Sequence, residues 1–414
     1  MTDTSATSDV AFGAGVRAPT RVATRNDCGP SAGAASRHAY QFVSLSHVPD
    51  AAWADLATRA LEPNAFYLPG WARAVDAHAT GKKSAHALLA WQDAEHRRLI
   101  GLLPVVSARR ALNIPVPVLV AWQAYAPLTA PLLDRDAADS AASGLLAAAS
   151  GAGAQALLLP SITTDGLSAQ ALRRAAASLG VKPRVLSEHA RARLAARQDA
   201  EVLLKQSLGA KKLKELRRQR HRLADTGDIT FSVASCPAQV GPALDTFLRL
   251  ETSGWKGARG TALARDSGDA RFVREAMVAM AASGSAEVVV LSCGETPVAA
   301  GLVLRHGRRA FFFKIAHDES AARLSPGVQL TLDLTRRVCA DPELDDADSI
   351  AIADHPMIDK VWRERLAVAD MLLPVRPGTL SFHAVAAAIA ARNSARHGAR
   401  RFVHAVRSQY RSRK

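Results

Sequence analysis

Two neighbouring stretches decide the fold: Ala310-Phe311-Phe312-Phe313-Lys314-Ile315-Ala316-His317-Asp318 and Arg323-Leu324-Ser325-Pro326-Gly327-Val328-Gln329-Leu330. The first is a short aromatic and aliphatic run between turn residues, which predicts a buried strand. The second predicts the start of a helix, because Ser325 suits the N-cap, Pro326 suits the first helical position and Gly327 lets a ligand approach the backbone. Apolar periodicity from Val328 to Val338 extends this helix to about Ala340. Unpaired N–H groups and the helix dipole attract anions at such a turn. The sequence therefore predicts a site for a phosphate-bearing cofactor.

The composition is typical of a soluble globular protein. The chain has 414 residues, of which 48% are hydrophobic and 22% are charged, and this length accommodates two hydrophobic cores. No apolar run approaches the roughly 18 residues that a membrane span requires. Residues 1–38 lack the continuous apolar segment of a secretory signal, so we expect a disordered leader. The cysteines form no C-x-x-C pair, which favours a reducing cytoplasm over a zinc site or a disulfide scaffold: Cys28, Cys236, Cys293 and Cys339.

The net charge of +15 is concentrated at the C-terminal end, where no Asp or Glu follows Asp370. Residues 377–414 are predicted to form a basic amphipathic tail. Two sets of apolar residues in it are spaced for one helical face: Phe382, Val385, Ala386 and Ile389, and then Phe402, Val406 and Tyr410. Such a tail could contact an anionic membrane surface. Solvation of the tail, or docking on its own protein, is the alternative.

One α/β module is predicted to occur twice, over residues 39–198 and 229–376. Each half holds a hairpin pattern with a glycine early in its second strand, followed later by a helical pattern and a short apolar strand. The hairpins are expected at 87–106 and 288–304, and the later strands at 156–159 and 349–352. After its β pattern, the first half continues with Pro127-Leu128-Thr129-Ala130-Pro131-Leu132-Leu133. No glycine opens a helix there, so the cofactor is expected in the second half.

A basic linker helix is predicted between the halves, within residues 199–228. It runs from Lys211 to Leu223 and is closed by Thr226-Gly227. It is interpreted as a connecting helix with a solvated basic face, or else as an arm that contacts phosphate or nucleic acid. The absence of interleaved aromatic residues speaks against nucleic acid as a partner.

Four motifs, in this order and spacing, carry a family resemblance: Lys211 to Leu223; Glu251-Thr252-Ser253-Gly254-Trp255-Lys256-Gly257 with Gly260-Thr261-Ala262; Pro297-Val298-Ala299-Ala300; and Ser325-Pro326-Gly327. The second half resembles the GCN5-related N-acetyltransferase (GNAT) fold. More narrowly, it is similar to the BioF2-like acetyltransferase domain of CelD-type cellulose-biosynthesis proteins, a double-GNAT group related in fold to FemABX-type transferases. The resemblance spans about Trp53 to Leu373 and is strongest from Lys211 onward.

The resemblance implies an α/β (α+β) fold of tandem GNAT-like lobes, each with a mixed central sheet flanked by helices. It also implies acetyl-CoA or another acyl-CoA as co-substrate, no metal, and a small-molecule amine or amino sugar as acceptor. A link to polysaccharide or cell-envelope biosynthesis follows from the same resemblance. The GNAT pyrophosphate loop, Arg/Gln-x-x-Gly-x-Gly/Ala, corresponds to Arg323-Leu324-Ser325-Pro326-Gly327-Val328. Here one extra residue precedes the glycine and the second small residue is missing.

Roles follow for the residues of this loop and its surroundings. The backbone N–H groups of Gly327, Val328 and Gln329 would hold the diphosphate at the helix start that Ser325 opens, and Arg323 would add a charged contact. An N–H group between Ile315 and His317 would serve the oxyanion.

Four residues at the expected strand ends are candidates for the general base: His317, Asp318, Asp354 and His355. Loop capping is the alternative role for each, and Asp354 in particular suits the N-cap of a helix through Trp362. Glu251 and Trp255 would line the acceptor pocket. Alternatively, they mark a helix end at Gly254 with a tryptophan in the core.

The predicted function is acyl transfer from a CoA thioester to a primary amine in the cytoplasm. Two alternatives remain at this point. One is a GNAT-like module that binds a partner without catalysis. The other is a FemABX-type transferase that uses aminoacyl-tRNA and contacts it through the basic linker helix.

Overall fold

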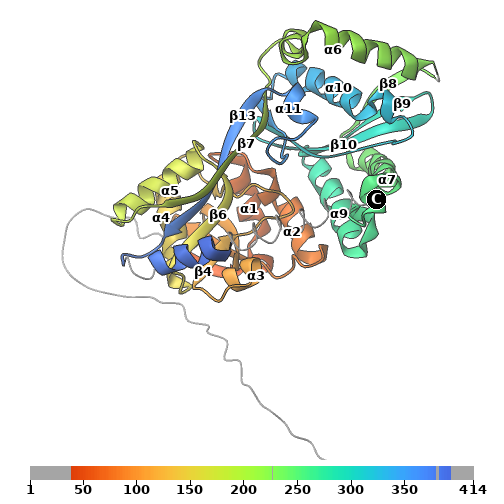
Figure 1. Cartoon of the computed structure of the whole chain (residues 1–414). Helices are drawn as coiled ribbons and strands as arrows, with labels where there is room; N and C mark the ends of the chain where they lie inside the picture. Colours follow the sequence, from red (N-terminus) through yellow and green to blue (C-terminus); the bar gives the residue numbers. More distant parts are fainter. Residues whose placement is uncertain (1–38, 226, 379–381, 393–414) are drawn as a thin grey trace, which may run out of the picture. The chain divides into compact units, whose positions relative to one another are not determined.

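The computed structural model describes residues 39–225, 227–378 and 382–392 (Figure 1). The elements of the first half are β1 (Tyr40–Ser44), α1 (Asp50–Thr58), α2 (Pro69–His78), β2 (His86–Trp91), β3 (Leu99–Ser107), α3 (Ala108–Leu112), β4 (Val118–Ala121), β5 (Leu132–Leu133), α4 (Ala138–Gly151), β6 (Ala156–Thr163), α5 (Leu167–Ser178) and β7 (Arg184–Ala195). Those of the second half are α6 (Ala200–Ala224), β8 (Ile229–Ala234), α7 (Pro237–Ser253), α8 (Trp255–Ala258), α9 (Ser267–Ala282), β9 (Ala286–Cys293), β10 (Thr296–His306), β11 (Arg309–His317), α10 (Pro326–Ala340), β12 (Asp346–Asp348), α11 (Ile358–Val361) and β13 (Glu364–Pro374).

The described strands form one sheet in which the two halves exchange their last strands. The strand order is β1-β2-β3-β4-β6-β13-β7-β12-β11-β10-β9-β8, with β5 pairing on β3. β7, the last strand of the first half, pairs with β12 of the second half, and β13 pairs with β6 of the first half. The division at residues 198 and 229 predicted from the sequence did not include this exchange. We call the β1–β6 side with its helices the first lobe, and the β8–β12 side the second lobe.

Arginine–aspartate pairs hold the exchanged strand β7 against β12. Arg191 and Asp348 are both fully buried, with Nη2 2.5 Å from Oδ2, and Arg191 Nη1 donates to the carbonyl of Pro127 at 2.6 Å. Asp346 accepts from Arg193 of β7 at 2.8 Å and from Arg309 of β11 at 2.6 Å. These charges offset one another inside the sheet, where an unpaired ion would be strongly unfavourable.

Aromatic rings join the two lobes on one face of the sheet. Phe66 and Trp71 of the first lobe pack against Phe311 and Phe313 of β11, with ring centroids 4.9–5.9 Å apart. Trp71 also packs against Phe272 of α9, at 5.6 Å. One continuous core therefore includes the first lobe and the α7–α9 face of the second lobe. A separate core lies on the opposite face, between the sheet and helices α6, α10 and α11.

Several sequence predictions are confirmed. Both hairpins form, as β2–β3 and β9–β10, and the apolar run 156–159 lies within β6. The prediction of a strand at residues 349–352 is wrong. Strand β12 ends at Asp348, Ile350 has a left-handed backbone with φ 51°, and Ile352 is 73% exposed.

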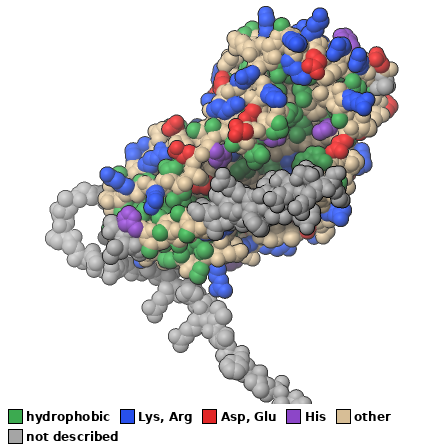
Figure 2. All heavy atoms as spheres, viewed as in Figure 1, with side chains coloured by type: hydrophobic (Ala, Val, Ile, Leu, Met, Phe, Trp, Pro, Cys, Tyr) green, Lys and Arg blue, Asp and Glu red, His purple; other side chains and the backbone are tan. Residues whose placement is uncertain are grey.

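The basic linker helix is part of the second lobe. It belongs to α6, which begins at Ala200, kinks at Gly209 (φ 73°) and continues to Ala224. Its leucines are buried against the α10 face, namely Leu213, Leu216 and Leu223. Its basic side chains are exposed, namely Lys211, Lys212, Lys214, Arg217 and Arg218. Figure 2 shows Lys and Arg side chains over the part of the surface where Figure 1 places α6.

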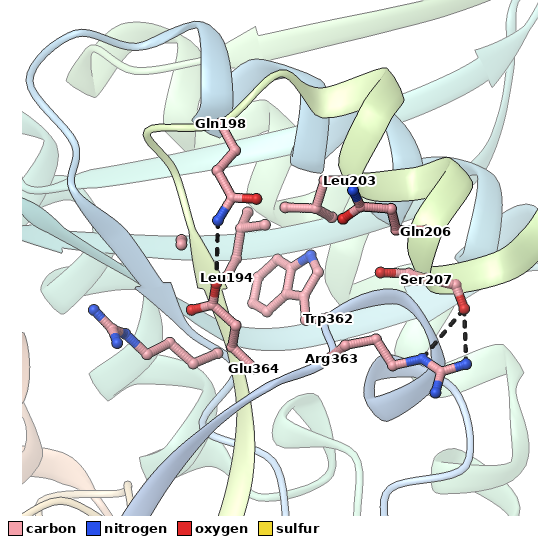
Figure 3. A pocket seen from close by; sticks show the side chains of 10 residues that line it. Leu194, Gln198, Leu203, Gln206, Ser207, Trp362, Arg363 and Glu364 are labelled. Carbon is pink, nitrogen blue, oxygen red and sulfur yellow. Dashed lines mark hydrogen bonds between the residues drawn. The ribbon is translucent and has the colours of Figure 1, made fainter.

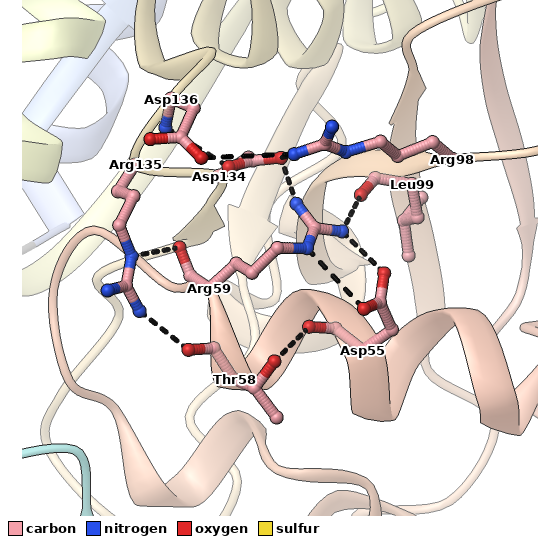
Figure 4. A network of polar contacts seen from close by, with 8 residues as sticks. All are labelled: Asp55, Thr58, Arg59, Arg98, Leu99, Asp134, Arg135 and Asp136. Carbon is pink, nitrogen blue, oxygen red and sulfur yellow. Dashed lines mark hydrogen bonds and ion pairs between the residues drawn. The ribbon is translucent and has the colours of Figure 1, made fainter.

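A charged network fixes α1 to the strands of the first lobe (Figure 4). Asp134 is fully buried and pairs with Arg59 and with Arg98, the latter at 2.9 Å. Arg59 also pairs with Asp55 at 2.6 Å and donates to the carbonyl of Leu99 at 3.1 Å. Each of these charged groups pairs with another protein group, so we infer that the network stabilises the first lobe.

Part of the predicted basic tail docks on its own protein. Residues 382–392 are helical, and their apolar face is buried in the core shared with the first lobe: Phe382, Val385, Ala386 and Ile389. Arg392 donates to the carbonyl of Leu112 at 2.6 Å. The second apolar set, Phe402, Val406 and Tyr410, and the leader 1–38 lie outside the described residues. Among the described helices, none combines the length and hydrophobicity that crossing a bilayer requires.

Removing the carboxylate of Asp348 should strongly destabilise the protein. In Asp348→Ala, the buried Arg191 loses its counter-charge, and such a loss costs about 3–5 kcal/mol. Urea unfolding of the variant measures this cost. Asp345→Ala is the control, since Asp345 pairs with Arg197 and Arg308 at the surface, and we expect it to unfold nearly as the wild type does. Equal stability of the two variants would contradict a structural role for the Arg191–Asp348 pair.

Acid should weaken the contact between the lobes through His306. Its Nδ1 accepts from the N–H of Asn64 at 2.8 Å, so the proton is on Nε2, which faces the carbonyl of Ala57 at 2.9 Å. Burial lowers the pKa of His306. Below about pH 6.5 the unfolded chain binds a proton that the folded state excludes, so stability is lost as the pH falls.

The matched variant for this effect is His306→Gln, which cannot titrate. Between about pH 7.5 and about pH 5.5, the free energy of unfolding of the wild type should fall by more than that of the variant. Urea titrations at both pH values measure it. A difference that is independent of pH would rule out the proposed role of His306.

Candidate functional site

The sheet opens along β11. β11 pairs with its parallel neighbour β12 only through Arg309, Ala310 and Phe311. Beyond Phe311, β11 continues to His317 with β10 as its only strand partner among the described residues. The backbone edge of residues 312–317 that faces away from β10 is therefore free of a strand partner, and α10 begins beside it.

Two N–H groups point to this open edge. The N–H of Asp318 donates to Val298 of β10 at 2.9 Å, whereas the carbonyl of Ile315 accepts from Lys256 Nζ at 3.1 Å and so faces away from β10. In an antiparallel pair, a residue directs both its N–H and its C=O to the same side, and sides alternate along the strand. Ile315 and His317 therefore direct their N–H groups to the open edge.

The helix start predicted at Pro326 is confirmed, as is its end at Ala340. The N–H groups of Gly327 and Val328 have no acceptor within the described part of the chain. Gln329 does not fit its predicted role, because its N–H donates to the carbonyl of Ser325 at 3.0 Å and its buried side chain donates to Leu216 of α6 at 2.8 Å. Two backbone donors, rather than three, are free at this end of α10.

Ser325 does not take its predicted role, whereas Arg323 is free to take its own. Ser325 occupies the N-cap position, but its backbone is left-handed (φ 54°, ψ 48°) and its hydroxyl makes no capping bond, which corrects the expected cap. Arg323 is exposed and has no ion-pair partner in the ranges that the structure covers. Its guanidinium is thus available, four residues before Gly327 in the chain.

A β-bulge determines which side chains face each side of β11. The pairing passes from Leu302–Lys314 to Val303–Phe312, so Phe313 is left without a partner on β10. Phe313 and Lys314 consequently face the same side, towards α7 and the first lobe, as their contacts with Trp71 and Glu251 show. Without the bulge, strict alternation would direct Lys314 to the α10 side.

Glu251 is the centre of a half-buried charge cluster on the α7 side. Its side chain is fully buried at the end of α7, and Oε1 accepts from Lys256 at 3.2 Å and from Lys314 at 3.4 Å. Oε2 accepts from the N–H of Leu263 at 2.8 Å. Burial lowers the pKa of Lys256, and the neighbouring ammonium of Lys314 lowers it further.

The first lobe contributes Tyr125 to this neighbourhood. Tyr125 donates to Asp269 of α9 at 2.6 Å, and its pKa is raised by burial, by this bond and by the charge of Glu251. Its backbone is left-handed, with φ 70°. Three buried side chains hold the loop that carries it by donating to loop carbonyls: Tyr67 to Trp122, Trp71 to Ala124 and Arg191 to Pro127.

The four predicted base candidates occupy different positions. His317 lies at the open edge, and its Nδ1 would be 3.4 Å from a Cβ placed on Gly327. The carboxylate of Asp318 accepts from the N–H of Ser320 at 2.9 Å, as a loop cap does. Asp354 is exposed and does not cap the following helix, which is shorter than expected and starts at Ile358.

His355, instead, provides the cap. Its Nδ1 accepts from the N–H groups of Met357 and Ile358 at 3.3 and 3.4 Å, so the neutral ring carries its proton on Nε2. Burial lowers the pKa of His355, and Lys256 is close enough to lower it further. Nδ1 of His355 is therefore engaged in this cap, which leaves Nε2 as a proton donor and not as a base.

Trp255 follows the helix end predicted at Gly254, but it is not a core residue. It is 48% exposed, and the guanidinium of Arg259 stacks over its ring, 4.9 Å from the centroid. The backbone N–H of Trp255 donates to the carboxylate of Glu319. A small concavity joins these residues to the open edge; it is lined by Leu250, Glu251, Gly254, Trp255, Lys256, Ile315, Ala316, His317 and Glu319. Within the described ranges, no group of three His, Cys, Asp or Glu residues could hold a metal ion.

A larger hollow, about 340 Å³, lies between α6, β7 and the start of β13 (Figure 3). Trp362 and Leu203 are among its apolar lining residues, and Arg363, which also lines it, donates to the carbonyl of Ser207 at 2.8 Å. None of the residues predicted for the site lines this hollow, so we do not include it in the candidate site.

Sequence reasoning missed Lys256, Lys314 and Tyr125. The signal for Lys314 was its place as the one charged residue inside an apolar strand. Lys256 stood within the Glu251–Gly257 motif, but its pairing with a residue five positions away depends on the turn at Gly254. Tyr125 had no local signal, because the lobes meet only in three dimensions.

Residues 210–354 match the family model described as an acetyltransferase (GNAT) domain. They begin within α6 and end after β12, and they include the open edge, the free end of α10 and the Glu251 cluster. The second lobe is therefore similar to GNAT acetyltransferase domains over these residues. No curated protein matches the chain at a significant level.

Solved structures share the fold at low sequence identity. The C-terminal domain of a putative lysylphosphatidylglycerol synthetase from Agrobacterium fabrum is similar over 81% of this chain and 94% of its own, with 15% identity and a TM-score of 0.51. FemX is similar over 80% of this chain and 95% of its own, with 11% identity and a TM-score of 0.51. The predicted fold class, α/β with a mixed sheet flanked by helices, is confirmed, although one continuous sheet runs through both lobes.

Proposed function

We propose that the protein is an acyl-CoA-dependent N-acyltransferase whose reaction takes place in the second lobe. The observation that carries the proposal is the open edge of β11 beside two free N–H groups, those of Gly327 and Val328, within a lobe similar to GNAT acetyltransferase domains. Together these features form an extended binding edge that ends in an anion site.

In this proposal, the two free N–H groups and the Arg323 guanidinium hold the donor's diphosphate. The thioester then lies along residues 312–317, where the N–H groups of Ile315 and His317 stabilise the oxyanion. The amine nitrogen attacks the thioester carbonyl carbon, the C–S bond breaks, and the thiol leaves with a proton in place of the one lost by the amine. His317 is our candidate base, because its ring stands at the open edge without a hydrogen-bond partner among the described residues.

The resemblance to BioF2-like and CelD-type domains supports the finer part of the proposal. We propose acetyl as the acyl group, the cytoplasm as the compartment, and an amine of polysaccharide or envelope biosynthesis as the acceptor. A second candidate function is aminoacyl transfer, which the exposed basic face of α6 and the fold shared with FemX favour. Binding of tRNA that is released by salt would support this second candidate.

Two measurements test the proposed function. Acetyl-CoA should raise the melting temperature, because a ligand that binds only the folded state stabilises it. Release of CoA thiol in the presence of a panel of amines and amino sugars should reveal turnover. No thermal shift together with no release would favour the non-catalytic module.

Gly327→Ala should separate donor binding from stability. A Cβ at Gly327 would lie 3.4 Å from His317 Nδ1 and 3.6 Å from Ile315 Cδ1, which the fold accommodates. The methyl group covers the approach to the free N–H groups, so we expect binding of CoA to weaken by roughly tenfold, or about 1.4 kcal/mol. The melting temperature should stay the same or rise, because Ala favours a helix more than Gly does.

The control for this variant is Gly241→Ala in α7, where a Cβ would meet no atom within 4 Å. Isothermal titration with CoA measures both variants. Unchanged affinity in Gly327→Ala would place the diphosphate elsewhere.

A further inference from the structure

The charges around Glu251 do not balance. The ammonium groups of Lys256 and Lys314 share one carboxylate oxygen, Oε1, while Oε2 is used by a backbone N–H. No other Asp or Glu of the described residues lies within ion-pair distance of either lysine. The cluster therefore carries one uncompensated positive charge.

This excess charge is held in a largely desolvated place. The side chains of Lys256 and Lys314 are only 22% and 21% exposed. Two like charges that share one counter-charge repel each other, and burial adds to the cost. An arrangement of this kind is stabilised when an anion binds, because the anion supplies the missing counter-charge.

Both ammonium groups retain hydrogen-bond donors for such an anion. An ammonium group has three N–H donors. Lys256 uses one on Glu251 and one on the carbonyl of Ile315, and Lys314 uses one on Glu251. Three donors in total remain free of a protein acceptor within the described residues.

The position of the pair points to the acceptor rather than the donor. The free N–H groups of Gly327 and Val328 lie on the α10 side of β11, where Ile315 and His317 also face. The β-bulge turns Lys314 to the opposite side, towards α7 and the first lobe, and Lys256 reaches the strand from α8 on that same side. The exposed ring of Trp255 lies beside Lys256, whose Nζ is 6.0 Å from the ring centroid.

We propose that Lys256 and Lys314 form an anion subsite, and that the acceptor amine carries a carboxylate or phosphate group that binds there. The substrate class is thus an amino acid-like or phosphorylated amine. Glu251 holds the two ammonium groups in place by accepting from both. The inference rests on the proposed function only for the identity of the anion's carrier, since the subsite itself is a property of the apo protein.

Lysine footprinting tests the subsite without requiring turnover. The full-length protein is acetylated with a water-soluble acetyl ester in chloride and in inorganic phosphate at equal ionic strength, and the rate at each lysine is read by mass spectrometry. A bound phosphate should slow labelling of Lys256 and Lys314 by about tenfold, which corresponds to occupancy of about 90% of the sites. Lys205, exposed on α6, is the internal control and should be labelled at the same rate in both salts.

Variants show whether the two lysines act together. Protection of Lys314 should be lost in Lys256→Met, and protection of Lys256 in Lys314→Met, whereas both should persist in Lys205→Met. Thermal melts identify any variant that does not fold. In that case the labelling of the wild-type protein in chloride and in phosphate decides whether the subsite exists. Equal labelling in chloride and phosphate at both lysines would overturn the subsite, even if the protein proves to be an acyltransferase.

Matched amines then identify the carrier. Glycine is compared with methylamine, and phosphoethanolamine with ethanolamine, by release of CoA thiol. The anionic member of a pair should have roughly tenfold higher kcat/KM, and Lys314→Met should reduce this ratio towards one. A ratio of one in the wild type would overturn the assignment to the acceptor. Protection by phosphate without turnover of any amine would uphold the subsite and count against the proposed function.

Discussion

The parting of β11 from β12 is the constraint on which the second lobe depends. A strand inside a sheet must satisfy its N–H and C=O groups on both sides, and β11 loses one neighbour after Phe311. The protein covers part of this edge with side chains, since Lys256 occupies the carbonyl of Ile315. The N–H groups are left without such cover. A ligand with carbonyl oxygens is the partner that this edge lacks.

In the first lobe, protein side chains hold the loop that follows β4. After β4, the chain continues through Trp122 to Pro127, and buried side chains from α2, from the turn before it and from β7 hold this loop by its carbonyls. Thr129 then donates to the carbonyl of Pro160 in β6 at 2.6 Å. The first-lobe helix that follows this loop, α4, begins at Ala138 without a glycine, whereas α10 of the second lobe begins with Pro326-Gly327. The first lobe instead carries Tyr125 to the neighbourhood of Glu251.

The elements that the sequence predicted correctly are those with local signals. Aromatic and aliphatic runs predicted the hairpins and β11, and Pro326 predicted the start of α10. Strand β12 was missed because its residues, Asp346-Ala347-Asp348, pair with arginines inside the sheet and show no apolar pattern. The apolar pattern that predicts a strand lies just after it, at residues 349–352.

Non-local features explain the remaining differences. The exchange of β7 and β13 depends on pairing between residues far apart in the chain, and the bulge at Phe313 depends on the register with β10. The donor loop could be located from Gly327, but the loss of Gln329 as a donor follows from the first helical hydrogen bond. The Lys256–Glu251–Lys314 cluster required the positions of α7, α8 and β11 together.

The exchange of strands also sets an order on how this chain can assemble during synthesis. β6 leaves the ribosome long before β13, its antiparallel neighbour in the finished sheet. Until residues 364–374 emerge, β6 has an unpaired backbone edge where β13 will later pair. An unpaired edge on a strand with apolar side chains can pair with other chains. The first lobe is thus encoded first but completed last, and a cut of the gene between residues 198 and 229 would remove β13 from β6.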